Sequence, residues 1–152
     1  MNSLKKILLI EDNKDDEILT IKAFRKNKLS NDIMVIRDGE EALDYFSHTG
    51  KYNSPEFEEL PTFVLLDLKL PKVDGLQILK HIRSNERTKR LPVVILTTSK
   101  EQSDLVMSYE LGVNSFVRKP IDFNEFMKAV NQLGMYWLIL NENPVDGRSK
   151  LL

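Results

Sequence analysis

Short, wholly apolar runs separated by helical patterns are the feature of this sequence that most limits its fold. Three such runs read ILLI, FVLL and VVIL. Strands that are apolar on both sides are typical of parallel sheets, because helices then cover both faces of the sheet. The expected strands are Lys6–Ile10, Ile33–Ile36, Phe63–Leu66, Val93–Thr97 and Ser115–Arg118.

Helical patterns occupy the intervals between these strands. The expected helices are Asp15–Lys26, Glu40–Ser47, Leu76–Ser84, Gln102–Leu111 and Phe123–Leu140. Asp122, followed three residues later by Glu125, has the spacing of a capping box at the start of the last helix. Right-handed crossovers between parallel strands then predict an α/β fold, a doubly wound five-stranded parallel sheet with an extended C-terminal helix. We expect one domain over residues 4–141 and a flexible tail over 142–152.

Composition narrows the class of protein. The chain has 152 residues, of which 41% are apolar and 30% charged, as in a globular domain. Its 22 basic and 23 acidic residues nearly cancel, which gives no electrostatic reason to expect direct binding of nucleic acid. The absence of cysteine excludes disulfides, zinc–thiolate sites and thiol catalysis.

No stretch of the sequence predicts a membrane segment or a signal peptide. The longest apolar run, Met135–Leu140, has six residues, whereas a membrane span needs about 18. Near the N-terminus only Ile7–Ile10 is apolar, which is shorter than the roughly 7–15 residues of a signal peptide core. We therefore expect a soluble cytoplasmic protein without a membrane partner.

Polar residues stand at the carboxyl ends of four predicted strands. They are Glu11 and Asp12, then Asp67, then Thr97 and Thr98, and last Lys119, which Pro120 follows. In an open parallel sheet these ends meet at one edge, where ligands bind. Each residue alone has an ordinary explanation, such as a turn, a strand former or a solvated lysine. Their coincidence at successive strand ends is what indicates a site.

The residue types predict the chemistry of this site. Three clustered carboxylates repel one another unless a cation neutralises them. With oxygen as the only donor, the cation should be a hard divalent ion such as Mg²⁺. A nucleophilic aspartate, Mg²⁺, a hydroxyl and a lysine together can transfer a phosphoryl group. The residue types therefore predict phosphoryl transfer at this edge of the sheet.

These stretches resemble a known family. ILLIEDNKDD, VLLDLKLPKVDG, VVILTTS and FVRKP occur in the order and spacing of the CheY-like receiver domains of two-component response regulators. The resemblance covers residues 4 to about 135. It implies a flavodoxin-like (βα)₅ fold. It also implies a signalling phosphoacceptor and not an enzyme, one that at most catalyses its own phosphorylation and dephosphorylation.

The resemblance assigns roles to individual residues. Asp67 matches the phospho-accepting aspartate, and Glu11 and Asp12 match the acidic pair that binds Mg²⁺, with Glu11 where many members have Asp. Lys69 matches the position whose backbone carbonyl is a metal ligand. Thr97, with Thr98 beside it, matches the switch hydroxyl, and Lys119 matches the lysine that pairs with the acceptor and the phosphoryl group.

Two further features follow from the same resemblance. Lys119-Pro120 matches a cis peptide bond of the family, a conformation that prolyl bonds reach at modest cost. Phe116 falls at the aromatic switch position, where members have Tyr, Phe or other residues.

The long connection over 48–61, the TTS motif and the YWLILN extension resemble the stand-alone, single-domain receivers that partner bacterial phytochromes. The implied partner is a sensor histidine kinase of the phytochrome type. After Asn141 only ENPVDGRSKLL remains, too short for a DNA-binding output domain. The 48–61 connection predicts either a solvated surface loop or an interaction element. A basic cluster near the third helix is expected to be a solvated face: Lys80, His81, Arg83, Arg87, Lys89 and Arg90.

Two other functions remain open from the residues. An aspartyl-phosphate phosphohydrolase would need a second Asp two residues after the nucleophile, where this chain has Lys69. A scaffold that acts without phosphorylation would predict an eroded acidic site, and none of its residues is replaced by an inert one.

The last helix predicts a homodimer. Its first part has one apolar stripe, but Met135–Leu140 is apolar on every side. Left exposed, this segment would form an interaction patch, and we expect Tyr136, Trp137, Leu138 and Leu140 in a two-fold interface. The alternative is that the segment folds back over the first helix of its own domain.

Overall fold

A central parallel sheet organises the computed structural model, which describes residues 5–29 and 32–144. Its strands are β1 (Lys6–Ile10), β2 (Asp32–Ile36), β3 (Phe63–Leu66), β4 (Val93–Thr97) and β5 (Ser115–Arg118). Their order across the sheet is β2-β1-β3-β4-β5, and every neighbouring pair is parallel. The predicted doubly wound sheet is therefore confirmed, with β2 beginning one residue earlier than expected.

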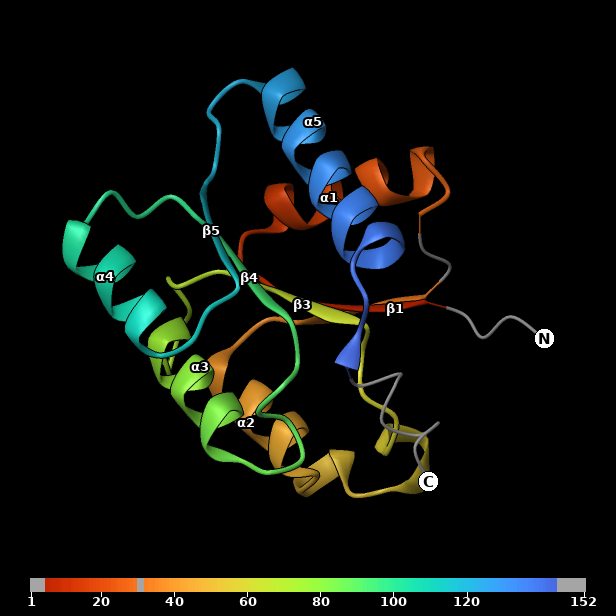
Figure 1. The fold of residues 1–152 in the computed structure, drawn as a ribbon, viewed down its shortest axis with the longest axis vertical. Coiled ribbons are helices and arrows are strands. Elements are labelled where there is room, and N and C mark those ends of the chain that lie inside the picture. Colours follow the sequence, from red (N-terminus) through yellow and green to blue (C-terminus); the bar gives the residue numbers. More distant parts are fainter. Residues whose placement is uncertain (1–4, 30–31, 145–152) are drawn as a thin grey trace.

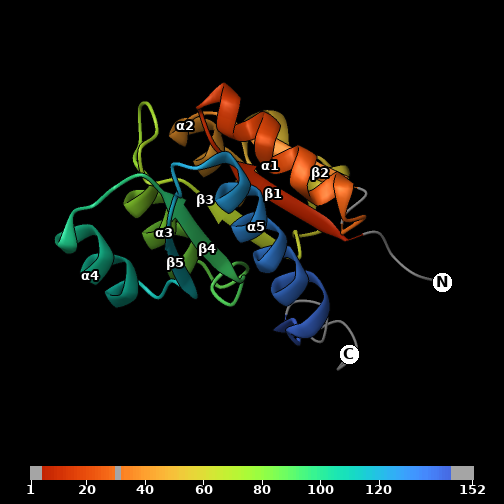
Figure 2. The ribbon, with the colours of Figure 1, turned by 90° about the horizontal axis from the view of Figure 1, so that it is seen from above.

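Helices cover both faces of the sheet. They are α1 (Lys14–Lys26), α2 (Gly39–Ser47), α3 (Gly75–Ser84), α4 (Gln102–Glu110) and α5 (Phe123–Gly134). Figure 1 shows α1 and α5 above the sheet and α2 and α3 beneath it, and Figure 2 shows the same layers from above. Four of these helices begin at a side-chain cap, namely Asn13, Asp38, Asp74 and Asp122.

Two apolar cores result from this layering. Alternate strand residues such as Leu8, Val64 and Ile95 pack with α2 and α3. Their neighbours Ile7 and Leu65 pack with α1 and α5. Strands that contribute to both cores have no polar face, which explains the uninterrupted apolar runs. Burying one such aliphatic side chain stabilises the fold by about 1.5–3 kcal/mol.

The cap of α5 takes a simpler form than a full capping box. The Asp122 carboxylate accepts a hydrogen bond from the Glu125 N–H at 3.0 Å, as expected for an N-cap. A reciprocal box instead starts α3, where the Asp74 and Gln77 side chains each bond the other's backbone N–H. Both devices satisfy N–H groups that lack a partner in the first turn of a helix.

The C-terminal segment departs from the single long helix that the sequence predicts. The α-helix ends at Gly134, and Met135–Leu140 continues as a π-helical turn. Gly134 lies so close to α1 that an added Cβ would stand 2.8 Å from the Phe24 ring, and 2.6 Å from the Leu29 side chain just after this helix. This close approach brings the π-helical turn over the core between α1 and α5.

Half of the predicted dimer interface is buried within the protomer. Trp137 and Leu138 are 8% and 2% exposed and belong to the core of α1 and α5. Their assignment to an interface between copies is therefore wrong, because the protomer's own core already covers both side chains. Tyr136 and Leu140 are 48% and 68% exposed, so only these two of the four expected residues face outward.

The start of the expected tail is attached to the domain. The Asn143 side-chain amide donates a hydrogen bond of 2.6 Å to the carbonyl of Thr62, just before β3. The remainder of the expected tail, from residue 145, lies outside the described residues.

The connection between α2 and β3 is an ordered, partly buried element and not a fully solvated loop. It contains two 3₁₀ helices, Gly50–Tyr52 and Pro55–Phe57. The Tyr52 ring is 4% exposed and meets the Tyr45 and Phe57 rings edge to face, with centroids 5.3 and 4.8 Å away. These aromatic contacts extend the core beneath α2.

The basic cluster near α3 is also less solvated than expected. The Arg83 guanidinium donates to the carbonyls of Gly112 and Leu91 and to the Asn114 side chain. The Arg87 guanidinium donates to three carbonyls around the α2–β3 connection. Both arginines therefore serve as structural donors. Within the described ranges, no helix has the length and apolar character needed to cross a membrane.

Candidate functional site

The carboxyl ends of the central strands bring the expected residues together. Glu11 directly follows β1, Asp67 follows β3 and Lys119 follows β5, while Thr97 is the last residue of β4. Glu11 and Asp67 are 3% and 5% exposed. The parallel order of the sheet therefore creates one site from segments that are far apart in the sequence.

Lys119 is the centre of this site. Its side chain is 4% exposed, and its ammonium lies 2.8 Å from Glu11 Oε1, 2.7 Å from Asp16 Oδ2 and 2.8 Å from Asp67 Oδ2. Charge-assisted hydrogen bonds of this length are the strong ones, and burial excludes the water that would weaken them. One buried cation thus holds carboxylates from three different segments.

The protonation states of the site follow from this arrangement. Burial, and next the charge of Asp67, raises the pKa of Glu11 to about 7. Burial acts in the same direction on Asp67, but the hydrogen bond and charge of Lys119, with the N–H of Lys69, lower the Asp67 pKa below its ordinary value. Burial alone would lower the Lys119 pKa. Its carboxylate partners outweigh this effect and raise the Lys119 pKa above its ordinary value. Asp67 is consequently the carboxylate held ionised, as a nucleophile requires.

A divalent cation fits the acidic part of the site. Glu11, Asp12 and Asp67 each offer an oxygen within 4.8 Å of the others, and Asp12 is exposed at the rim. An all-oxygen donor set next to solvent suits a hard ion that keeps some of its waters, such as Mg²⁺ or Mn²⁺. When bound, such an ion would neutralise the carboxylates and polarise a phosphoryl oxygen.

The Lys69 backbone lies beside Asp67. Its N–H donates to Asp67 Oδ1 at 3.1 Å, and its side chain points to solvent. The use of its carbonyl as a metal ligand stays a prediction. A close contact fixes the same loop: a Cβ on Gly75 would stand 2.6 Å from the Asp67 carbonyl oxygen. Only glycine lets α3 begin this close to Asp67.

The two expected hydroxyls differ in their surroundings. Thr97 is completely buried, and its Oγ1 accepts a hydrogen bond from the Ser99 N–H at 3.3 Å. Thr98 is exposed. Ser99, itself buried, donates from its hydroxyl to Asp104 Oδ2 at 2.6 Å. Thr97 therefore lies at the start of a short polar chain that leads into the first turn of α4.

Phe116 is partly buried in this structure. Its ring packs against the core of α2 and α3, and the Arg118 guanidinium carbon lies 5.8 Å from the ring centroid. Its role as an aromatic switch stays a prediction.

The expected cis peptide bond between Lys119 and Pro120 is wrong. No peptide bond is cis in the part of the chain that the structure describes. The trans form of a prolyl bond is the lower in free energy by about 0.5–1 kcal/mol. With the bond trans, the Lys119 ammonium already reaches its three carboxylates.

Asp16 is the site residue that the sequence patterns did not identify. It stands in the first turn of α1 and contacts Lys119 across 103 positions of sequence. The sequence feature that could have identified it is its position four residues after Asp12, in a helix that begins shortly after the first strand. Carboxylates are common in the first turn of a helix, because they interact favourably with the positive end of the helix dipole. The sequence pattern therefore gave no reason to expect the contact with Lys119.

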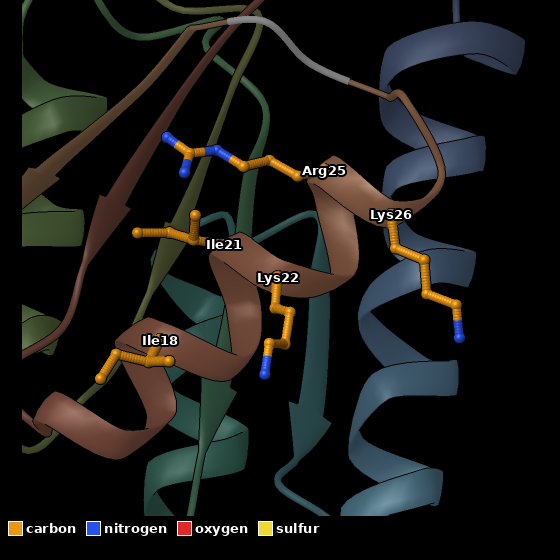
Figure 3. A pocket seen from close by; sticks show the side chains of 5 residues that line it. All are labelled: Ile18, Ile21, Lys22, Arg25 and Lys26. Atoms are coloured by element: carbon orange, nitrogen blue, oxygen red, sulfur yellow. The ribbon is translucent and has the colours of Figure 1, made fainter.

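An open groove lies along α1 and shares no residue with the site. Its volume is about 770 Å³, and Ile18, Ile21, Lys22, Arg25 and Lys26 line it (Figure 3). Ile18 is 48% exposed. Two isoleucines and three basic residues thus line this groove.

The doubly wound sheet and the acid–lysine cluster at its carboxyl edge define a receiver-like α/β domain. The family described as the response regulator receiver domain matches residues 7–131, and the chain belongs to this family. The resemblance to CheY-like receivers of two-component signalling is thereby confirmed.

Three relatives show where the chain stands within the family. It is 42% identical to a probable methanogenesis regulatory protein, FilR2, of Methanothrix harundinacea, over 91% of this chain and 86% of the relative. It is 38% identical to the response regulator Rcp1 of Synechocystis, over 90% of this chain and 91% of Rcp1. The Mn²⁺-bound structure of Rcp1 superimposes with a TM-score of 0.85, covering 92% of this chain and 99% of that one.

The third relative is a phosphorylated cyanobacterial phytochrome response regulator, RcpA. Its structure superimposes with a TM-score of 0.87 at 36% identity, over 93% of this chain and 99% of RcpA. The chain is thus similar to phytochrome response regulators over most of its length.

Proposed function

We propose that this protein is a phosphoacceptor response regulator, which takes a phosphoryl group onto Asp67 from a sensor histidine kinase in a Mg²⁺-dependent reaction. The observation that carries the proposal is the buried Asp67 carboxylate, 2.8 Å from the buried Lys119 ammonium and beside Glu11 and Asp12. Two relatives support it, since RcpA is described as phosphorylated and Rcp1 as Mn²⁺-bound.

The side chains supply most of the chemistry. An Asp67 carboxylate oxygen forms a bond to phosphorus as the bond from phosphorus to the histidine nitrogen of the donor breaks, and that nitrogen leaves as neutral imidazole once it has taken up a proton. Lys119 neutralises charge on the phosphoryl oxygens. A divalent ion held by Glu11, Asp12 and Asp67, with the Lys69 carbonyl, would neutralise the rest.

The product acts as a signal and the protein is not a turnover enzyme, beyond slow hydrolysis of its own acyl phosphate. A phosphoryl oxygen on Asp67 would accept the hydrogen of the Thr97 hydroxyl, with Thr98 at the rim of the site, and draw the following loop inward. Phe116 would then turn further inward, changing the surface over α4 and β5. This surface is where phosphorylation would be read by a partner.

We propose a phytochrome-type kinase as the donor, because Rcp1 and RcpA, to which the chain is similar, are response regulators and RcpA is a phytochrome response regulator. The reaction would take place in the cytoplasm, where kinases obtain ATP. The nearly balanced charge of the chain supports protein partners and not direct binding of nucleic acid.

We also propose a homodimer through the outward side of the C-terminal segment. Met135, Tyr136, Ile139 and Leu140 are between 41% and 68% exposed and lie within six consecutive residues. Apolar and aromatic side chains gathered in this way favour an interface, and a two-fold contact is the commonest solution for identical chains.

Incubation with acetyl phosphate and Mg²⁺, followed by intact-mass measurement, tests the acceptor assignment. The wild type should gain one phosphoryl group, and Asp67→Asn should gain none because the amide is a poor nucleophile. Asp12→Asn should need more Mg²⁺ to reach the same extent of labelling. Asp15→Asn, which removes an exposed carboxylate from α1, is the control and should be labelled like the wild type. Full labelling of Asp67→Asn would contradict the assignment.

A further inference from the structure

The hydrogen-bonding capacity of the Lys119 ammonium is fully used. An ammonium group has three hydrogens to donate. In this structure they go to three acceptors, Glu11 Oε1, Asp16 Oδ2 and Asp67 Oδ2, at 2.7–2.8 Å. Because no fourth hydrogen exists, the direction of any one N–H is set by the other two partners.

The three acceptors are not equivalent. Glu11 and Asp67 also belong to the group of carboxylates that can hold a divalent cation, whereas Asp16 does not. A bound divalent ion would draw the oxygens of Glu11 and Asp67 toward itself and would repel the ammonium. Asp16 is then the partner of Lys119 that neither reacts nor binds the ion.

Asp16 is rigidly placed for this task. Its backbone N–H donates to the Asn13 side chain at 2.9 Å, and its carbonyl accepts from the Thr20 hydroxyl at 2.7 Å. The adjacent Glu17 forms a two-bond pair with Arg37, at 2.8 and 2.9 Å, which ties the same turn of α1 to the segment after β2. The Asp16 carboxylate is 22% exposed, so its bond to Lys119 is only partly screened by water.

We propose that Asp16 is a positioning residue, which holds the Lys119 ammonium at the acceptor while a divalent ion occupies the carboxylates of Glu11, Asp12 and Asp67. The inference rests on the proposed phosphoacceptor function. Asp16 keeps the ammonium on the α1 side of the site, which leaves Glu11 and Asp67 available to the ion. The same contact keeps one N–H directed at the reacting oxygen.

Asp16→Asn and Asp15→Asn form a matched pair of variants. Both remove one carboxylate from the first turn of α1, but Asp15 is exposed and has no contact with Lys119. The first readout needs neither metal nor phosphodonor: the ¹⁵N-detected signal of the Lys119 ammonium and the exchange of its hydrogens with water. Asn keeps an acceptor oxygen but loses the charge, which weakens one of the three strong hydrogen bonds. This weakening should speed the exchange about tenfold in Asp16→Asn and leave it unchanged in Asp15→Asn.

The second readout is the Mg²⁺ affinity, measured by titrating amide shifts of the strand ends. Asp16→Asn should weaken Mg²⁺ binding about three- to tenfold, because the released ammonium competes for Glu11 and Asp67. In a Lys119→Gln background the same substitution should have much less effect, since the competitor is gone. An equal loss in both backgrounds would show a general charge effect and overturn the proposal.

The third readout is the initial rate of labelling by acetyl phosphate at saturating Mg²⁺. The rate should fall about tenfold in Asp16→Asn, stay within about twofold of wild type in Asp15→Asn, and recover in part in Asp16→Glu, which restores the charge. Unchanged ammonium exchange in Asp16→Asn would refute the positioning role. If the wild type itself is never labelled, the phosphoacceptor function fails, while the exchange and Mg²⁺ readouts still decide whether Asp16 holds Lys119.

Discussion

Thr97 joins the acidic site to the loop after β4, since its carbonyl accepts a hydrogen bond of 2.7 Å from the Lys119 N–H. Its hydroxyl oxygen accepts from the Ser99 N–H, which uses a lone pair and not the hydroxyl hydrogen. Ser99 in turn donates to Asp104 in the first turn of α4. A new acceptor on Asp67 could therefore recruit the Thr97 hydrogen and move a loop that is already tied to a helix.

This arrangement predicts that Thr97→Ala separates phosphorylation from its structural effect. The variant should be labelled by acetyl phosphate, because Asp67, Lys119 and the acidic pair are unchanged. The amide shifts of α4 and the ring signals of Phe116 should respond to labelling much less than in the wild type. Thr97→Ser retains the hydroxyl and should respond normally. A full response in Thr97→Ala would rule out this route.

Tyr45 predicts a dependence of stability on alkaline pH. The ring is 2% exposed, and burial raises the pKa of its hydroxyl to about 12, whereas an unfolded chain has a tyrosine pKa of about 10. A raised pKa means that the folded state retains the proton more tightly, so this stabilising contribution is complete below pH 10. It is lost as the pH rises from about 10 through 12.

Tyr45→Phe isolates this contribution from the lysines that titrate in the same range. Between pH 9 and pH 11 the free energy of unfolding of the wild type should fall by about 1.4 kcal/mol more than that of Tyr45→Phe. Urea unfolding followed by circular dichroism at both pH values measures the difference. Parallel losses in the two proteins would show that Tyr45 does not titrate with a raised pKa.

At the scale of elements, Arg87 fastens the α2–β3 connection to the domain. Its guanidinium donates to the carbonyls of Phe46, Phe57 and Glu58 at 3.4, 3.2 and 3.0 Å. These carbonyls lie at the end of α2, at the end of the second 3₁₀ helix and directly after it. The Arg87 side chain therefore connects the two segments, which are also joined by a hydrogen bond of 2.9 Å between the His48 ring and the Ser54 carbonyl.

Arg87→Ala should lower the free energy of unfolding by about 1–3 kcal/mol, since several hydrogen bonds from a charged donor are lost. Arg90→Ala is the control, because Arg90 is exposed and pairs with Glu86 only at 3.8 Å. Its effect should stay below about 0.5 kcal/mol. Chemical denaturation of both variants measures these changes in the free energy of unfolding. Equal changes would show that the hydrogen bonds of Arg87 do not stabilise the connection.

The sequence was most informative about the positions of the strands. The bounds of β1, β3, β4 and β5 agree with the expected ranges. In β1, β3 and β4 a run of four apolar residues between polar or turn-forming residues is typical of a short buried strand. The positions of Glu11, Asp67, Thr97 and Lys119 followed from these bounds, since parallel strands present their carboxyl ends at one edge. Backbone topology thus determined where the site lies.

Contacts that depend on side-chain reach were not predictable in the same way. The bond from Lys119 to Asp16 depends on how a long side chain is oriented after β5, which no spacing rule encodes. Arg83 and Arg87 read as part of a solvated basic face, because a sequence pattern does not show which nearby carbonyls lack a donor. An all-apolar run such as Met135–Leu140 likewise does not distinguish a core from an interface.

At the scale of the whole molecule, the C-terminal segment is shared between the protomer's core and its surface. Trp137 and Leu138 face inward against α1 and α5, and Tyr136 and Leu140 face outward. Substitutions in the two sets should therefore have different consequences. Trp137→Ala should destabilise the fold by about 3–5 kcal/mol through the cavity that it leaves, whatever the oligomeric state.

The proposed homodimer is tested with the outward set alone. Sedimentation velocity at micromolar concentration should show a dimer for the wild type and a folded monomer for Tyr136→Glu with Leu140→Glu, because two charges would be buried without partners in a two-fold contact. The matched control places the same charges on another exposed apolar surface: Val106→Glu with Tyr109→Glu on α4, where the side chains are 48% and 54% exposed. This control should remain dimeric if the interface lies in the C-terminal segment. A control that dissociates while the C-terminal variant stays dimeric would move the interface to α4. A wild type that is monomeric with and without acetyl phosphate would remove the homodimer altogether.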